Sequence, residues 1–124
     1  MIVDTAEQQD TLFSFVHEDR ESVTYLALRG HLDARTANTL KEIIQTLIQS
    51  NTKRLALDLS GLETLDSSGM GGVVSLIGRL HTAGGKVKVF GLQGQPKELF
   101  TALNMHRAFD LVDDLNQAVK ALTK

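Results

Sequence analysis

The fold is decided by residues 54–80, RLALDLSGLETLDSSGMGGVVSLIGRL. Residues 54–59 form a short and nearly continuous apolar run, which is typical of a strand covered on both faces. After Asp66 and two serines, apolar side chains recur at intervals of three and four residues, which predicts one face of a helix. This face consists of Met70, Val73, Val74, Ile77, Leu80 and His81. The stretch therefore predicts a buried strand, a loop and a helix that begins at residues 66–69.

The residues that follow predict a further strand and two more helices. Gly84–Gly85 ends the helix, and alternating charged and apolar residues in KVKVFG, residues 86–91, indicate a strand near a sheet edge. Pro96 suits the first turn of a third helix, which Asn104 ends. We expect residues 108–112 to form a last short strand, followed by a fourth helix. The apolar faces of these two helices are Leu99, Phe100 and Leu103, and Leu115, Ala118, Val119 and Leu122.

The residues before this stretch predict a hairpin and a helix. Residues 11–29 hold two apolar runs separated by a charged cluster at 17–21, and Gly30 ends the second run. A helix is expected from Asp33 onward, capped by the side-chain oxygen of Asp33 or Thr36. Its apolar face consists of Leu40, Ile43, Ile44, Leu47 and Ile48.

This order of elements predicts a single α/β domain. The sheet is expected to be mostly parallel, with an antiparallel edge strand and about four flanking helices. A length of 124 residues with 42% hydrophobic residues fits one compact core. We expect residues 1–10 to be a flexible segment and residues 11–124 to form the domain.

The composition argues against several classes of protein. A formal net charge of -2 gives no basic excess for binding nucleic acid, and the absence of cysteine excludes disulfides and thiolate metal sites. No apolar run approaches the roughly 20 residues that span a bilayer, and the polar start lacks the pattern of a secretion signal. We therefore expect a cytoplasmic protein that is not inserted in a membrane and does not bind nucleic acid directly.

Chemically, the most informative segment is LDSSGMGG, residues 65–72. Unpaired amides and the positive end of the helix dipole favour a negative group there, so a phosphoryl group on Ser67 or Ser68 can be accommodated. The Asp66 carboxylate would repel a phosphate, or it can accept a hydrogen bond from a serine hydroxyl and orient it. Gly69, Gly71 and Gly72 leave a bare backbone that permits close approach by another protein. The alternative is purely structural, with Asp66 and the serines as ordinary helix caps and the glycines as packing residues.

Other candidate sites are weaker. The segment lacks the glycine, lysine and serine spacing of a phosphate-binding loop, and it lacks the Gly-x-Ser-x-Gly pattern of a hydrolase nucleophile. The four histidines show no metal-ligand spacing, and residues 91–95, GLQGQ, suit a turn better than a dinucleotide site. We therefore expect no metal, no cofactor, no catalytic residue and no enzymatic activity.

Two blocks of the sequence resemble the STAS-domain family, and more narrowly the bacterial anti-sigma factor antagonists. The first is Gly30-His31-Leu32-Asp33, which is similar to the family's Gly-x-Leu-Asp block. The second runs from residues 57–60, LDLS, through residues 65–71, LDSSGMG, which is similar to the family's Asp-Ser-Ser/Thr-Gly-Leu-Gly signature. Met70 replaces the commoner leucine, and Gly72 is an additional glycine. The resemblance covers roughly residues 11–122.

The resemblance implies a switch between binding partners. In that family the serine directly after the aspartate is phosphorylated, which places the modification on Ser67 ahead of Ser68. The unphosphorylated protein would bind an anti-sigma factor that is also a serine-protein kinase, and phosphorylation would release it. A metal-dependent serine phosphatase would then restore the binding form. The expected partner-binding residues are Asp33, Asp66, Ser68, Gly69, Met70, Val73 and Val74.

A second interpretation is a standalone STAS subunit that serves as a scaffold in a transport or lipid-trafficking complex. In that case Ser67 and Ser68 would act only as helix caps. The presence of both serines after Asp66 favours the phosphorylation switch.

Overall fold

The computed structural model describes residues 12–20 and 22–123, and its four strands form one sheet in the order β1-β2-β3-β4. β1 and β2 pair antiparallel, whereas the pairs β2-β3 and β3-β4 are parallel. The strands are β1 Phe13–Arg20, β2 Val23–Leu32, β3 Arg54–Leu65 and β4 Lys86–Phe90. The helices are α1 Ala37–Gln49, α2 Ser67–Thr82, α3 Gly94–Ala102, the short 3-10 helix η2 Met105–Arg107, and α4 Leu115–Leu122. The predicted α/β domain is confirmed, with its mostly parallel sheet, antiparallel edge strand and four α-helices.

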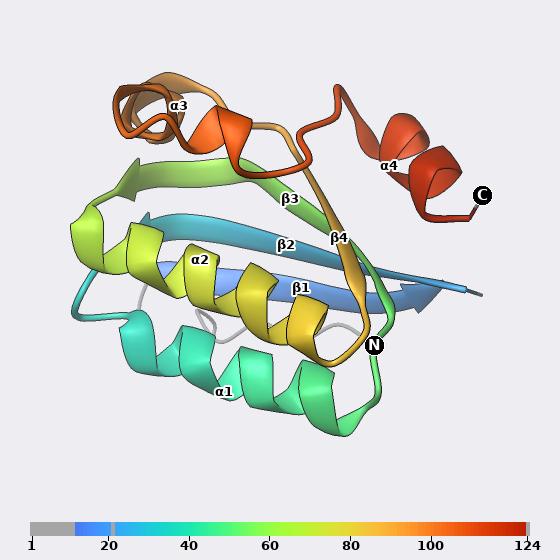
Figure 1. The fold of residues 1–124 in the computed structure, drawn as a ribbon. Coiled ribbons are helices and arrows are strands. Elements are labelled where there is room, and N and C mark those ends of the chain that lie inside the picture. The colour runs from blue at the N-terminus through green and yellow to red at the C-terminus, as the bar shows by residue number, and fades with distance from the viewer. Residues whose placement is uncertain (1–11, 21, 124) are drawn as a thin grey trace.

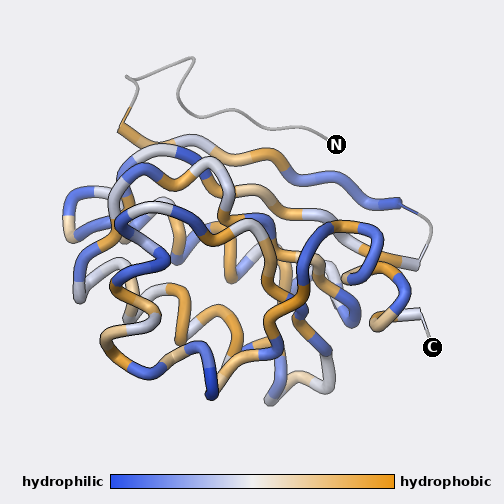
Figure 2. Tube along the Cα trace, turned by 90° about the horizontal axis from the view of Figure 1, so that it is seen from above, coloured by the Kyte–Doolittle hydropathy of each residue, from blue (hydrophilic) through white to orange (hydrophobic). Residues whose placement is uncertain are grey.

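The sheet separates two layers of helices. α1 and α2 lie side by side on one face, and α4 lies on the other (Figure 1). The larger core fills the space between the sheet and the α1-α2 layer, where side chains such as Leu26, Leu57 and Leu76 are completely buried. A smaller cluster joins Ala118 and Leu122 of α4 to the opposite face. Figure 2 shows hydrophobic residues recurring along the strands and on successive turns of the helices, as two-sided burial requires.

Two strands are longer than the sequence predicted. β2 continues past Gly30 to Leu32, because Gly30 has a φ of +96° and the pairing register shifts beside it. A Cβ on Gly30 would overlap the Leu12 carbonyl oxygen, so only glycine allows the strand to pass this point. β3 likewise continues past Leu59 to Leu65, with a second register shift opposite residues 27–29. Both extensions bring the strand ends to the first turn of α2.

Two further details of the prediction were wrong. The buried face of α2 runs through Gly69, Met70, Val73, Leu76 and Leu80, while His81 is exposed and Val74 is 41% exposed. The buried face of α2 is therefore rotated toward Leu76, which was not among the predicted residues of this face. Residues 108–112 do not form a strand but make one parallel bridge, between Leu111 and Val89.

The α4 face of the sheet holds the only tyrosine of the chain. The Tyr25 hydroxyl donates a hydrogen bond to Asp58 Oδ2 at 2.7 Å. Burial, together with this hydrogen bond and the carboxylate charge, raises the pKa of Tyr25 to about 12. The phenol is therefore neutral across the physiological pH range.

Candidate functional site

The candidate site lies where two parallel strands end side by side. β2 ends at Leu32 and β3 ends at Leu65, and these two residues are paired across the sheet. In open α/β sheets, the carboxyl ends of the strands are where ligands and partners usually bind. Residues 33–36 leave the sheet from β2, and Asp66 leads from β3 into α2. The two blocks singled out in the sequence thus meet at one edge of the molecule.

The first turn of α2 presents both serines to solvent. Asp66 is the N-cap, and its Oδ1 accepts a hydrogen bond from the Gly69 amide at 2.8 Å. Ser67 and Ser68 are the first two helical residues, and both are exposed. Within the described residues neither hydroxyl makes a hydrogen bond, so Asp66 caps the helix and does not orient a serine. The structural interpretation of Asp66 as a cap is therefore correct, and it leaves both hydroxyls accessible.

Gly69 allows this turn to touch the end of β2 directly. A Cβ at this position would overlap the Leu32 carbonyl oxygen and lie 2.7 Å from Leu65 Cδ1. The Asp66 amide also donates to the Leu32 carbonyl at 3.4 Å. The backbone of the α2 start is therefore seated against the backbone of β2, with no side chain between them.

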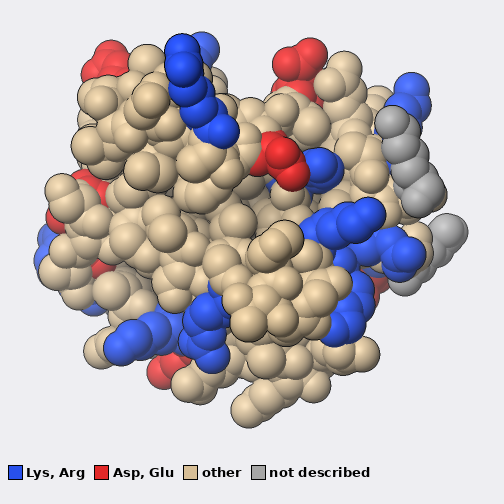
Figure 3. Space-filling model, in the orientation of Figure 1, with Lys and Arg blue, Asp and Glu red and all other residues tan. Residues whose placement is uncertain are grey.

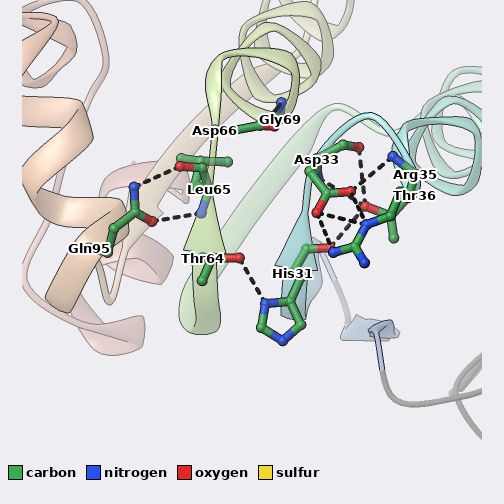
Figure 4. Close-up of polar contacts among 9 residues, drawn as sticks. All are labelled: His31, Asp33, Arg35, Thr36, Thr64, Leu65, Asp66, Gly69 and Gln95. Atoms are coloured by element: carbon green, nitrogen blue, oxygen red, sulfur yellow. Dashed lines mark hydrogen bonds and ion pairs between the residues drawn. The ribbon is translucent and has the colours of Figure 1, made fainter.

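Asp33 lies in the loop that follows β2 and is held by its own neighbours. Its Oδ1 accepts from the Arg35 amide at 2.9 Å, and its Oδ2 accepts from Arg35 Nη2 at 2.7 Å (Figure 4). Hydrogen bonds from Arg35 hold the pKa of Asp33 below its usual range.

The prediction that the side chain of Asp33 or Thr36 caps α1 was wrong. Thr36 occupies the N-cap position, but its hydroxyl accepts from the Asp33 amide and donates to the His31 carbonyl oxygen instead.

A glutamine from a distant part of the chain fixes the residue before Asp66. Gln95, in the first turn of α3, accepts from the Leu65 amide at 2.7 Å and donates to the Leu65 carbonyl at 2.8 Å. Figure 4 shows this side-chain amide facing the end of β3. β4 does not reach this point, because it ends at Phe90, which pairs with Asp58. Gln95 thus takes the place of a neighbouring strand at Leu65. This contact was not predicted, because Gln95 and Leu65 are 30 residues apart and no local sequence pattern links them.

A histidine and a threonine complete the site edge. His31 Nδ1 and Thr64 Oγ1 lie 2.8 Å apart and join the ends of β2 and β3 (Figure 4).

The described residues contain no group of three or more potential metal ligands placed to hold an ion. None of the helices in the described part of the chain combines the length and apolar character needed to cross a membrane.

The structure divides the predicted site residues into three groups. Asp66, Ser67 and Ser68 are exposed and Asp33 is partly exposed, so these four lie on the accessible surface just beyond the paired strand ends Leu32 and Leu65. Gly69, Met70 and Val73 are buried, which places them in the packing beneath that surface and not on it. Val74 is exposed, but it lies two turns further along α2.

The comparisons with known proteins come from both sequence and structure. The STAS domain model matches residues 14–118. An anti-sigma factor antagonist from Mycobacterium paratuberculosis superposes with a TM-score of 0.80 at 22% identity, over 90% of this chain and 95% of that one. The phosphorylated form of the Bacillus cell fate determinant SpoIIAA superposes with a TM-score of 0.65 at 18% identity, over 86% of this chain and 97% of that one. At these identities the likeness shows the shared fold.

One curated relative is a much longer protein. YvdB, a candidate sulfate transporter of Bacillus subtilis, is 26% identical over 113 residues. The match covers 86% of this chain but spans only 21% of that relative's length.

Proposed function

The chain belongs to the STAS domain family, and from that premise we propose that it is an anti-sigma factor antagonist controlled by serine phosphorylation. In its unphosphorylated form it binds an anti-sigma factor that is also a serine-protein kinase. Phosphorylation of Ser67 releases that partner, and a metal-dependent serine phosphatase restores the binding form. The protein itself is a regulator of transcription and not an enzyme. It acts in the cytoplasm, where the kinase can draw on ATP.

One observation carries this proposal. Two serine hydroxyls with no hydrogen-bond partner among the described residues lie exposed in the first turn of α2, beside the carboxylate of Asp66. A kinase active site needs a hydroxyl that it can reach, and the capping role of Asp66 leaves both serines available. The geometry does not distinguish them, so the choice of Ser67 ahead of Ser68 rests on the family resemblance.

The surroundings of Ser67 favour a modification that changes the surface while keeping the fold. A phosphoserine carries about -1.5 to -2 charges at neutral pH, which suits the amide-rich start of a helix. The same charge adds to the exposed carboxylate of Asp66, whereas the nearby carboxylate of Asp33 is already paired with Arg35. A partner docked there would meet repulsion and a higher desolvation cost. Weakening the complex by roughly 100-fold requires only about 2.8 kcal/mol.

The first experiment is mass spectrometry of the protein purified from its own cells, with and without phosphatase treatment. We expect one phosphoryl group, located on Ser67. The Ser67→Ala variant should bind the kinase partner whether or not ATP is present, whereas the matched Ser68→Ala variant should still be released by ATP. Release of Ser67→Ala by the kinase and ATP would contradict the assignment to Ser67, and an unmodified protein under both growth and stress would contradict the switch.

A second candidate function is favoured by the match to the YvdB transporter. In that case the chain is a standalone STAS scaffold in a transport or lipid-trafficking complex, and Ser67 only begins a helix. The Ser67→Asp variant separates the two functions. It should weaken binding of a kinase in the first case, and it should leave assembly of the complex unchanged in the second.

A further inference from the structure

A groove follows the outer edge of β4, at the end of α2 opposite to the serines. It has a volume of about 610 Å³ and lies between the second half of α2, residues 108–110 and α4. Its α2 wall carries Val74, which is 41% exposed, and Ile77, which is partly buried. We call this feature the β4 groove. An accessible apolar wall of this kind is a candidate contact surface for another molecule.

The backbone of β4 is only partly paired on the groove side. Lys86 donates its amide to the Lys53 carbonyl at 2.8 Å, so its backbone faces β3. Val89 faces the opposite way, because it donates to the Asp110 carbonyl at 3.0 Å and accepts from the Val112 amide at 2.8 Å. Backbone groups alternate in direction along a strand, so those of Val87 also face away from β3. Within the described residues no strand pairs with Val87, and one donor and one acceptor therefore line the groove.

Side chains on the two faces of β4 differ in character. Val87 and Val89 are buried in the core beneath α2. Lys86 and Lys88 alternate with them along the strand and so lie on the opposite face, where Phe90 packs against α4. An extended segment paired with Val87 would place alternate side chains on these same two faces. One set would contact the apolar wall made by Val74, and the other would lie beside the two lysines.

The charges of the groove favour an acidic occupant. Its lining contains Lys86, Lys88 and His81 but only one carboxylate, Asp110, which already binds Lys88 at 3.0 Å. Lys86 is exposed and has no carboxylate within 4.0 Å among the residues that the structure describes. Figure 3 shows Lys and Arg side chains gathered over the first half of β4, to the right of centre. This local excess contrasts with the net charge of -2 of the whole chain.

We propose that the β4 groove binds an extended segment of a partner protein in which apolar and acidic residues alternate, by adding a strand beside Val87. A helix in the groove would leave the Val87 amide and carbonyl without partners, which is unfavourable for buried backbone groups. A second copy of this chain, paired edge to edge, would bring the lysines of both β4 strands together, which like-charge repulsion opposes. The site is independent of Ser67, since it uses the opposite end of α2.

The test uses a short synthetic peptide that alternates valine with aspartate and glutamate. Binding is followed by the amide NMR spectrum of the full chain and by hydrogen exchange at Val87. We expect shifts confined to the β4 groove and slower exchange of the Val87 amide. A peptide with lysine in place of the acids should bind at least about tenfold more weakly, and so should a peptide with proline at its centre, which removes a backbone donor.

Two pairs of variants test the groove from the protein side. Val74→Asp should weaken peptide binding by about tenfold or more. Val119→Asp is the control, because Val119 is a valine of α4 with a similar exposure of 36% and lies outside the groove. Lys86→Ser should also weaken binding, whereas Lys97→Ser on α3 should not. The absence of binding, equal binding of the lysine peptide, equal effects of the control variants, or occupation of the groove by a second copy would overturn the proposal.

Discussion

Replacing Gly69 by alanine tests whether the first turn of α2 is seated directly on β2. The added Cβ would overlap the Leu32 carbonyl oxygen and lie 2.8 Å from the Leu32 carbonyl carbon. Both obstacles belong to the backbone of a paired strand, so they cannot rotate away as a side chain can. We therefore expect the start of α2, with Ser67 and Ser68, to be displaced from the sheet.

The expected change in the free energy of unfolding of Gly69→Ala follows from two opposing effects. Overpacking a core costs about 1–3 kcal/mol, and a rigid obstacle places Gly69→Ala near the upper value. Alanine gains about 1 kcal/mol over glycine in helix propensity, which leaves a net loss of about 2 kcal/mol in the free energy of unfolding. For a domain of this size the loss lowers the Tm by about 8 °C.

Gly71 supplies a matched control in the same helix. A Cβ at Gly71 meets no atom within 4 Å, so Gly71→Ala should be stabilised by the higher helix propensity of alanine with no opposing overlap. We expect its Tm to rise by about 4 °C. Urea and thermal unfolding of both variants, followed by circular dichroism, measure the two effects. If Gly69→Ala is as stable as Gly71→Ala, the close backbone contact at Leu32 is absent and the account of the site fails.

Three further predictions concern single interactions. Gln95→Ala should lower the free energy of unfolding, measured with urea, by about 1–3 kcal/mol, and it should speed hydrogen exchange in the first turn of α2. Gln93→Ala is the control, because it removes one exposed hydrogen bond and should have neither effect. The chain has one tyrosine and no tryptophan, so the phenolate absorbance reports on Tyr25 alone, and it should titrate near pH 12. Because the pKa of Tyr25 is raised on folding, this residue stabilises the fold below pH 10, and the contribution is lost as the pH rises toward 12. Arg35→Met should raise the pKa of Asp33 in a carboxyl NMR titration. Because that pKa is lowered on folding, the pair stabilises the fold above the unfolded pKa of the carboxyl, and acid removes this contribution.

Periodicity, together with glycine, proline and capping signals, was sufficient to predict the order of the four strands and four α-helices and the position of the α2 start, but it also predicted a strand at residues 108–112 that does not form. The apolar run of β3, the following Asp66 and the helical spacing after it correctly placed two serines at a helix N-terminus. The exact face of α2 was not predictable in the same way, because Val74 and Leu76 are both apolar and either fits a helical stripe. Packing decides between them, and it buries Leu76 completely.

Other features depend on contacts between distant residues. The extension of β3 to Leu65 depends on pairing with Leu32 and on the side chain of Gln95, neither of which leaves a local pattern. Residues 108–112 have the composition of a strand, but they follow directly on the 3-10 helix Met105–Arg107 and make only one bridge, between Leu111 and Val89. Thr36 does stand at the N-cap of α1, but the predicted side-chain capping bond is absent because its hydroxyl bonds backward into its own loop.

The backbone contact at Gly69 has an entropic consequence for association. Ordering a loop or a helix end at an interface costs free energy that must be recovered from the contacts formed. Here the turn that carries Ser67 is already immobilised by the Asp66 cap, the β2 backbone and Gln95. A partner would meet a preorganised surface, so even a small complementary area could give a stable complex whose lifetime depends sensitively on one added charge.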